Sequence, residues 1–168
     1  PSYTEAALNL AVIYNDLGKY GEAREVYQAA LSRQKRTPGT MDTYVRGKIA
    51  NMYADIAGAY ASSGMIGEAI AEYRRALDLC PTFIDIRLRL GDAYRDQGQL
   101  EEAVAQYEEI IRQNPSYLPA RLHYGIALYS AGRKDEAART WEELLSLSPG
   151  HRAAEMYLKL ARDGVPTA

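Results

Sequence analysis

The sequence predicts an all-α protein built from stacked helix-turn-helix units. One short pattern, a glycine followed after three variable residues by Glu-Ala, occurs four times in the chain. Three copies begin 34 residues apart, at Gly64, Gly98 and Gly132. A fixed period of this length is typical of repeated supersecondary units, each of which buries its apolar face only against its neighbours.

Each residue type in the pattern favours a junction between two helices. Glycine adopts the positive φ that ends one helix and permits a tight turn into the next. The glutamate falls in the first turn of the following helix, where the positive end of the helix dipole stabilises a carboxylate. Apolar residues recur at intervals of three and four on both sides of the pattern, as amphipathic helices require.

The first unit is expected to pair a helix over residues 4–17 with a second helix that runs from residue 20 to beyond residue 31. Its first helix has an apolar stripe at Ala7, Leu10, Ala11 and Tyr14. This spacing puts all four side chains on one face of the helix, which predicts that they pack against the second helix.

An insert separates the first two units. From Gly18 to Gly64 the spacing is 46 residues, which is 12 more than the later period. The added stretch contains Pro38-Gly39, which is typical of a tight loop. Thr40 is a suitable N-cap for a helix that continues through Tyr60. We therefore predict that the insert lengthens both flanking helices.

Two glycines lie inside this long predicted helix, Gly47 and Gly58. Glycine within a helix costs about 1 kcal/mol relative to alanine. We therefore expect a close neighbour, or a bend, at each of these sites.

The later units are regular and end at prolines. Pro81, Pro115 and Pro149 each follow a predicted second helix and prevent it from continuing. After Pro149-Gly150 comes one more amphipathic segment, over residues 152–162. Repeat arrays need a polar outer face at their ends. We therefore interpret this last segment as a solubilising capping helix.

The positions around each glycine identify the type of repeat. They are Tyr53, Ile56-Ala57, Tyr60, Ala69, Tyr73, Ala76 and Pro81 in the second unit; Leu90-Gly91, Tyr94, Ala103, Tyr107, Ile110 and Pro115 in the third; and Tyr124-Gly125, Leu128, Ala137, Trp141, Leu144 and Pro149 in the fourth. The pattern resembles the tetratricopeptide repeat, a family of protein-binding modules. The first unit matches it through Leu10-Ala11, Tyr14, Ala23, Tyr27 and Ala30 but lacks the closing proline.

The resemblance implies a fold and its boundaries. The expected architecture is an all-α, right-handed α-solenoid of four helix-turn-helix tetratricopeptide repeats plus a C-terminal capping helix. The repeats would cover residues 4–37, 50–83, 84–117 and 118–151, with the insert at 35–48 and the capping helix at 152–163. All of them are expected to form a single domain over residues 1–168.

Composition and motifs argue against several classes of function. The net charge is −2, with 20 basic and 22 acidic residues, so the bulk composition does not indicate a nucleic-acid partner. The single cysteine, Cys80, excludes an intramolecular disulfide. No stretch approaches the ~18 apolar residues that a membrane-spanning helix needs. No pattern indicates a cofactor, metal or catalytic site, and we expect a cytoplasmic, non-catalytic protein, with a bacterial periplasm as the alternative compartment.

The resemblance also implies where a partner binds. In this family the first helix of each repeat lines a concave groove, and the ligand lies along it. The predicted partner-binding residues are Leu8, Val12, Asn15, Ala54, Gly58, Leu88, Asp92, Arg95, Leu122, His123, Ile126 and Tyr129. Such a groove has an apolar floor with a few polar anchors, which suits a peptide or an amphipathic helix of another protein.

Chaperone-binding members of the family carry a clamp of Lys, Asn and Arg residues for a C-terminal carboxylate. Here Leu8 and Val12 replace the first Lys and Asn, Asp55 replaces the next Asn, and Asp85 replaces a Lys. Only Arg89 remains. We therefore do not expect recognition of a heat-shock-protein tail.

Three alternatives stay open. Some groove residues pack against neighbouring helices instead of a ligand; the groove or the terminal helices assemble copies of the chain into a homo-oligomeric scaffold; or the chain is the interaction module of a larger enzyme or signalling protein. In addition, a basic cluster around the insert forms either a solvated surface or a docking patch for an acidic partner. This cluster comprises Arg33, Lys35, Arg36, Arg46 and Lys48.

Overall fold

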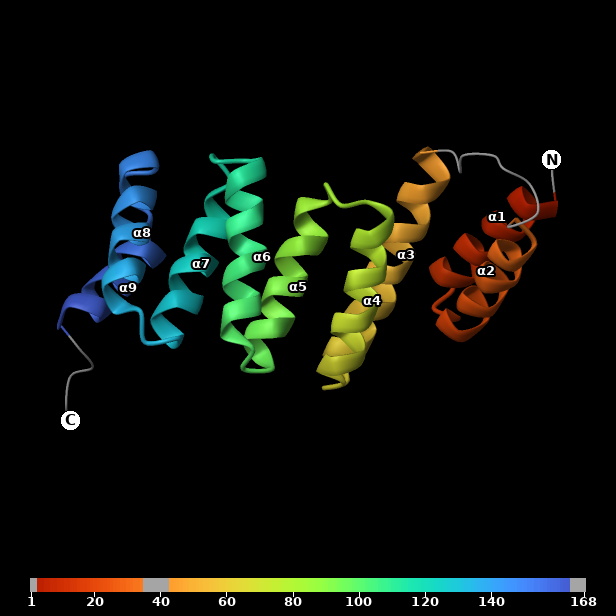
Figure 1. Ribbon diagram of the computed structural model, residues 1–168, viewed down its shortest axis with the longest axis horizontal. Helices are drawn as coiled ribbons and strands as arrows, with labels where there is room; N and C mark the ends of the chain where they lie inside the picture. Colours follow the sequence, from red (N-terminus) through yellow and green to blue (C-terminus); the bar gives the residue numbers. More distant parts are fainter. Residues whose placement is uncertain (1–2, 35–42, 164–168) are drawn as a thin grey trace. The chain divides into compact units, whose positions relative to one another are not determined.

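The computed structural model describes residues 3–34 and 43–163, and the secondary structure of these residues is helical (Figure 1). The helices are α1 (Tyr3–Asp16), α2 (Tyr20–Gln34), α3 (Thr43–Ser62), α4 (Ile66–Leu79), α5 (Ile84–Asp96), α6 (Leu100–Gln113), α7 (Leu118–Ser130), α8 (Lys134–Leu147) and α9 (Arg152–Asp163). The two helices of each repeat pack together as the sequence predicts: α1 with α2, α3 with α4, α5 with α6 and α7 with α8.

The chain divides into two compact units. The first, Pro1–Pro81, contains α1 to α4, and the second, Thr82–Ala168, contains α5 to α9. The division falls at Pro81, where the second predicted repeat ends. The sequence-based expectation of a single domain did not include this division.

Glycines with positive φ end the first helix of each hairpin. Gly18, Gly64, Gly98 and Gly132 have φ values of +72°, +77°, +79° and +81°. At Gly98 the backbone N–H donates to the carbonyl of Arg95, and the next N–H, of Gln99, donates to that of Tyr94, both over 2.9 Å. This pair of bonds satisfies carbonyls that the helix end would otherwise leave unpaired. The predicted role of the repeated glycine is confirmed.

The insert lengthens mainly α3. This helix has 20 residues and α2 has 15, whereas the other described helices have 12 to 14. The predicted loop at Pro38-Gly39 and the predicted N-cap Thr40 lie outside the described residues. Of the close neighbour or bend expected at Gly58, the close neighbour is not there, because a Cβ built on Gly58 would meet only the Tyr73 hydroxyl, at 4.0 Å. That distance is an ordinary contact.

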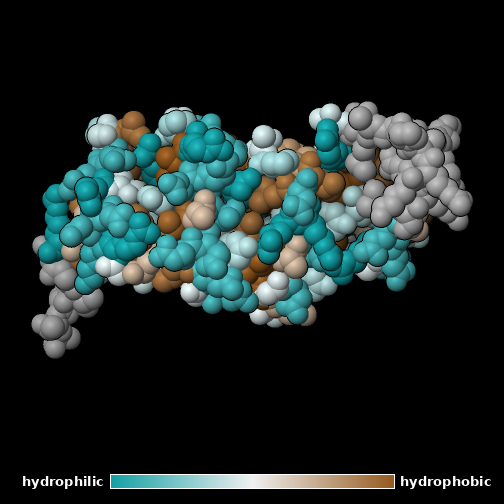
Figure 2. Space-filling view, in the orientation of Figure 1, coloured by the Kyte–Doolittle hydropathy of each residue, from teal (hydrophilic) through white to brown (hydrophobic). Residues whose placement is uncertain are grey.

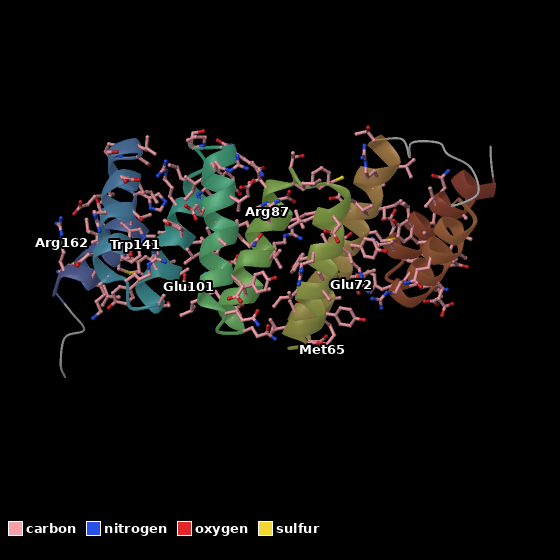
Figure 3. All side chains as sticks on the ribbon, viewed as in Figure 1. Met65, Glu72, Arg87, Glu101, Trp141 and Arg162 are labelled. Atoms are coloured by element: carbon pink, nitrogen blue, oxygen red, sulfur yellow. The ribbon has the colours of Figure 1, made fainter. Side chains whose placement is uncertain are left out.

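Aromatic rings packed on glycines form the core of the second unit. Trp141 and Tyr107 are fully buried. A Cβ at Gly125 would lie 2.3 Å from Trp141 Nε1, and one at Gly91 would lie 2.5 Å from the Tyr107 ring. The two helices of each of these repeats therefore lie so close that an aromatic ring of one contacts the glycine backbone of the other. Trp141, labelled in Figure 3, also stacks on Tyr157 of α9 at a centroid distance of 5.3 Å.

The first unit has a charged group in its core. Glu72 of α4, labelled in Figure 3, is only 2% exposed. It forms ion pairs with Arg24 of α2 and Arg75 of α4. The Tyr27 and Tyr53 rings also meet edge to face, with centroids 5.4 Å apart. Burial, together with the neighbouring tyrosine, raises the pKa of Tyr27. Its hydroxyl therefore stays neutral near pH 7.

Candidate functional site

The predicted groove residues of the second unit lie on two helices that contact each other. Leu88, Asp92 and Arg95 belong to α5; Leu122, His123, Ile126 and Tyr129 belong to α7. Helices α5 and α7 touch although α6 lies between them in sequence. All seven residues are half-buried. Each side chain therefore keeps surface that a ligand can contact.

A hydrogen-bonded polar cluster lies at the α5 side of this face. Asp92 Oδ1 accepts a hydrogen bond from the Tyr107 hydroxyl at 2.7 Å and one from His123 Nδ1 at 2.6 Å. Arg95 Nη1 lies 3.1 Å from the same oxygen. Because a carboxylate only accepts hydrogen bonds, His123 carries its proton on Nδ1.

The cluster fixes the charge of Asp92. Burial acts to raise the pKa of this carboxyl, but hydrogen bonds from His123 and Tyr107 and the nearby charges of His123 and Arg95 outweigh burial and lower it. Burial and the Asp92 charge raise the pKa of Tyr107. At neutral pH the centre of the cluster is therefore a carboxylate held by a neutral phenol, a histidine and an arginine.

Helix α9 extends the same face. Met156 follows Leu122 by the 34-residue period, as Leu122 follows Leu88. Helices α7 and α9 touch, and the Met156 side chain is 57% exposed. The sequence-based interpretation missed Met156 because it treated the last helix only as a cap. The 34-residue spacing was the available signal.

The predicted groove residues of the first unit behave differently. Leu8, Asn15 and Ala54 are buried, with 5%, 8% and 3% of their surface exposed. They belong to α1 and α3, which pack against each other, and Asn15 Nδ2 donates to Asp55 Oδ2 at 3.0 Å. Their burial leaves little surface for a ligand, so a ligand role for these three residues stays a prediction that their burial does not favour. The alternative of packing against neighbouring helices applies to them.

The other two groove residues of the first unit, Val12 and Gly58, are half-buried. Val12 lines a pocket of about 280 Å³ between α1 and α3, together with Asn9, Ile13, Val45 and Lys48. No residue of the second unit contributes to this pocket, so we treat it separately from the α5–α7–α9 face.

Only part of the predicted basic cluster falls in the described structure. Arg46 Nη2 lies 3.4 Å from Thr43 Oγ1 on the same helix, and Lys48 is exposed. Lys35, Arg36 and the side chain of Arg33 lie outside the described residues. The docking patch therefore stays a prediction.

The described residues contain no group of three or more His, Cys, Asp or Glu side chains that could hold a metal ion. Among them there is also no helix long and apolar enough to cross a membrane. Figure 2 shows a mainly hydrophilic surface over α6 and α8 on the face in view.

Comparisons with known proteins identify the family. Models described as tetratricopeptide repeat match residues 3–82, 60–115 and 88–152. The chain belongs to the tetratricopeptide repeat family. Tetratricopeptide domains serve as protein-interaction scaffolds, and this chain is a protein-interaction module of that kind. No curated protein sequence matches the chain.

Solved tetratricopeptide structures share the fold. The second such domain of human RPAP3, in complex with the HSP70 peptide SGPTIEEVD, has a TM-score of 0.61 and 25% identity, covering 67% of this chain and 98% of that one. The first domain of Spaghetti (RPAP3), bound to the HSP90 peptide SRMEEVD, has a TM-score of 0.64 and 22% identity, covering 70% and 94%. MamA AMB-1 has a TM-score of 0.64 and 18% identity, covering 95% and 81%. The all-α helical-repeat fold is confirmed.

Proposed function

We propose that this tetratricopeptide protein is a non-catalytic adaptor that binds a peptide or amphipathic helix of a partner on the face formed by α5, α7 and α9. The observation that supports the proposal is an apolar row beside the Asp92 cluster, formed by Leu88 on α5, Leu122 on α7 and Met156 on α9. Leu88 and Leu122 are half-buried and Met156 is exposed. Apolar surface that stays partly exposed in this way commonly marks an interaction site.

The row sets the spacing that a ligand must match. Packed helices lie about 8–10 Å apart, so the three apolar side chains recur at about that interval. An extended segment in the polyproline-II conformation has three residues per turn and advances about 9 Å per turn, so every third side chain lies on the same side. An α-helix advances about 10 Å in seven residues. The expected ligand therefore carries apolar residues at every third position if it is extended, or at every seventh if it is helical.

The polar cluster gives the ligand a direction. Its members Asp92 and Arg95 belong to α5, and the α9 end offers Met156 and Leu160 instead. Arg95 has further N–H donors besides those that face Asp92 and Asp96. We expect hydrogen-bonding groups of the ligand over α5 and apolar groups over α9.

The ligand proposed here differs from the peptides that the RPAP3 domains bind. Leu8, which stands where the clamp has its first lysine, is buried, and an acidic residue, Asp85, stands where the clamp has a later one. An acidic C-terminal tail would therefore find few cations here. We expect peptides ending in EEVD to bind at least about 10-fold more weakly than a ligand with the apolar spacing described above, a difference of about 1.4 kcal/mol.

The test is a peptide-display selection against the purified chain, followed by fluorescence anisotropy with the selected peptides. Leu122→Asp puts a charge in the middle of the row and should weaken binding at least about 10-fold. Ala105→Asp, at an exposed position of α6, is the matched control and should leave affinity unchanged. Peptides that lack the predicted spacing, or that bind both variants equally, would refute the proposal.

A second candidate function is self-assembly through α1. Leu10, Ile13 and Leu17 share one face of this helix and are 40%, 53% and 65% exposed. The positions that match Leu10 in the next two repeats, Ile56 and Leu90, are buried. Sedimentation equilibrium of the parent chain and of Ile13→Lys tests this candidate. Self-association that the substitution abolishes would support it. A parent chain that stays monomeric up to about 100 μM, well above the micromolar range of specific association, would contradict it.

A further inference from the structure

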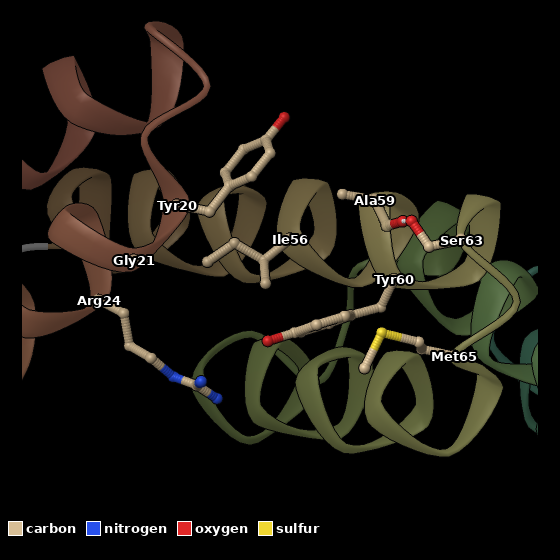
Figure 4. A pocket seen from close by; sticks show the side chains of 8 residues that line it. All are labelled: Tyr20, Gly21, Arg24, Ile56, Ala59, Tyr60, Ser63 and Met65. Atoms are coloured by element: carbon tan, nitrogen blue, oxygen red, sulfur yellow. Dashed lines mark hydrogen bonds between the residues drawn. The ribbon is translucent and has the colours of Figure 1, made fainter.

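The first unit contains a second pocket, between the start of α2 and the end of α3 (Figure 4). Its volume is about 240 Å³. Tyr20 and Tyr60 provide aromatic walls, Ile56 lies between the two rings, and Met65 adds a thioether beside Tyr60. This pocket belongs to the first unit, whereas the α5–α7–α9 face belongs to the second.

Residue differences between repeats explain why the pocket is open. In the second unit α6 packs against α7, and the buried Val104 occupies the repeat position that Arg24 has in the first unit. The Arg24 side chain instead pairs with the buried Glu72 on α4. Gly21 stands where α6 has Glu101, and a Cβ there would meet nothing within 4 Å. The space between α2 and α3 is therefore left unfilled.

The size and walls of the pocket indicate what it binds. Sites for small-molecule ligands usually measure about 300–1,000 Å³, so 240 Å³ suits one large side chain better than a cofactor. Aromatic rings pack well edge to face against tyrosines, and a methionine sulfur makes favourable contacts with a ring edge. We propose that this pocket is an anchor site for a single aromatic side chain presented by a partner protein.

The proposal assigns the pocket a specific energetic role. Aromatic residues that insert into a pocket at the centre of an interface often dominate binding energy. Tyr20 and Tyr60 are half-buried, so an inserted ring would cover the exposed remainder of both. An aliphatic side chain would fill part of the volume but would lack the ring–ring and ring–sulfur contacts.

Methyl NMR of the chain labelled at the methionine ε-carbons tests the proposal. N-acetyl-tryptophanamide and N-acetyl-tyrosinamide are the probes, and N-acetyl-leucinamide is the aliphatic comparison. The Met65 signal should shift saturably, with a Kd of about 1–5 mM for a probe of this size. Met52, which is buried in the same unit, and Met156, which is exposed in the other, are internal controls and should not shift.

Two adjacent serines provide a matched pair of variants. Ser63 lines the pocket and Ser62 does not; both are exposed, and their hydroxyls donate to the carbonyls of Ala59 and Gly58, respectively. Ser63→Phe should fill the mouth of the pocket and abolish the Met65 shift, whereas Ser62→Phe should leave it intact. Gly21→Leu fills the pocket from the opposite wall and should also abolish the shift.

Three results would overturn the proposal. The first is that the Met65 signal does not shift at probe concentrations up to about 20 mM. The second is a Met65 shift that persists in both Ser63→Phe and Gly21→Leu. The third is a Kd for N-acetyl-leucinamide within about 2-fold of the Kd for the aromatic probes. None of these results depends on the α5–α7–α9 face, so Leu122→Asp should bind the aromatic probes like the parent chain. The two proposals can therefore fail independently.

Discussion

Replacing Gly125 with alanine tests how the helices of the second unit are spaced. The new Cβ would lie 2.3 Å from Trp141 Nε1 and 2.5 Å from Trp141 Cε2. The Trp141 ring is fully buried and stacked on Tyr157, so it has little room to move. Overpacking a core of this kind costs about 1–3 kcal/mol, and the rigid ring argues for the upper part of that range. Better helix propensity returns about 1 kcal/mol.

The net expectation is that Gly125→Ala lowers the free energy of unfolding of the second unit by about 1–2 kcal/mol. For a unit of this size that corresponds to a fall in Tm of about 5–15 °C. Gly58→Ala is the matched control: its Cβ would meet only the Tyr73 hydroxyl at 4.0 Å. The control should gain up to about 1 kcal/mol from helix propensity alone. The same substitution should thus change stability in opposite directions at the two sites.

Urea unfolding provides the measurement. Trp141 is the only tryptophan in the sequence, so its fluorescence reports on the second unit, and circular dichroism follows the helices of both units. Trp141→Phe removes that fluorophore, so its variants are followed by circular dichroism. This substitution should relieve part of the clash, so the double variant with Gly125→Ala should be more stable than the sum of the single changes predicts. The reasoning would be refuted by a Gly125→Ala chain at least as stable as the parent, or by additive effects of the two substitutions.

Two further predictions concern buried charge. Glu72→Gln removes a charged acceptor that is 2% exposed and paired with Arg24 and Arg75. It should lower the free energy of unfolding of the first unit by about 2 kcal/mol, measured by urea unfolding followed by circular dichroism. A change below about 0.5 kcal/mol, the usual size of surface effects, would contradict this prediction. Asp92 has a folded-state pKa below the ordinary value of 3.8, so its contribution to stability is fully present above that value and is lost as pH falls through the folded-state pKa. Unfolding of the second unit, followed by Trp141 fluorescence, should therefore be less acid-sensitive in Asp92→Asn than in the parent chain, and equal acid sensitivity would refute it.

The sequence predicted the architecture because its repeats mark both periodicity and turns. The glycines at 18, 64, 98 and 132 needed positive φ in every copy, and no other residue type adopts that conformation as readily. Helix bounds followed from the same pattern, within a residue or two. The close approach at Gly125 was less visible, since its importance comes from the Trp141 ring 16 residues later.

The candidate site was predictable only in part. Equivalent positions in different repeats were treated as equivalent surfaces, which holds for Leu88 and Leu122 but fails for Leu8 and Ala54. The failure has a physical cause: exposure of a groove position depends on how closely the neighbouring helix packs, and Leu8 and Ala54 lie on α1 and α3, which contact each other. Met156 was missed because α9 was interpreted only as a cap, although α9 touches α7 and Met156 follows Leu122 by the same 34-residue period.

The two units achieve stability in different ways, and this difference favours different binding roles for them. In the second unit ring-on-glycine contacts fix the helix spacing, and the Asp92 carboxylate has three donors around it. A surface held this firmly loses little conformational entropy when a ligand binds, which suits recognition of a peptide by spacing. In the first unit Arg24 pairs with Glu72 and leaves an aromatic-walled pocket where the later repeat places a packed valine. An unfilled pocket of that size suits a single anchor side chain better than an extended ligand.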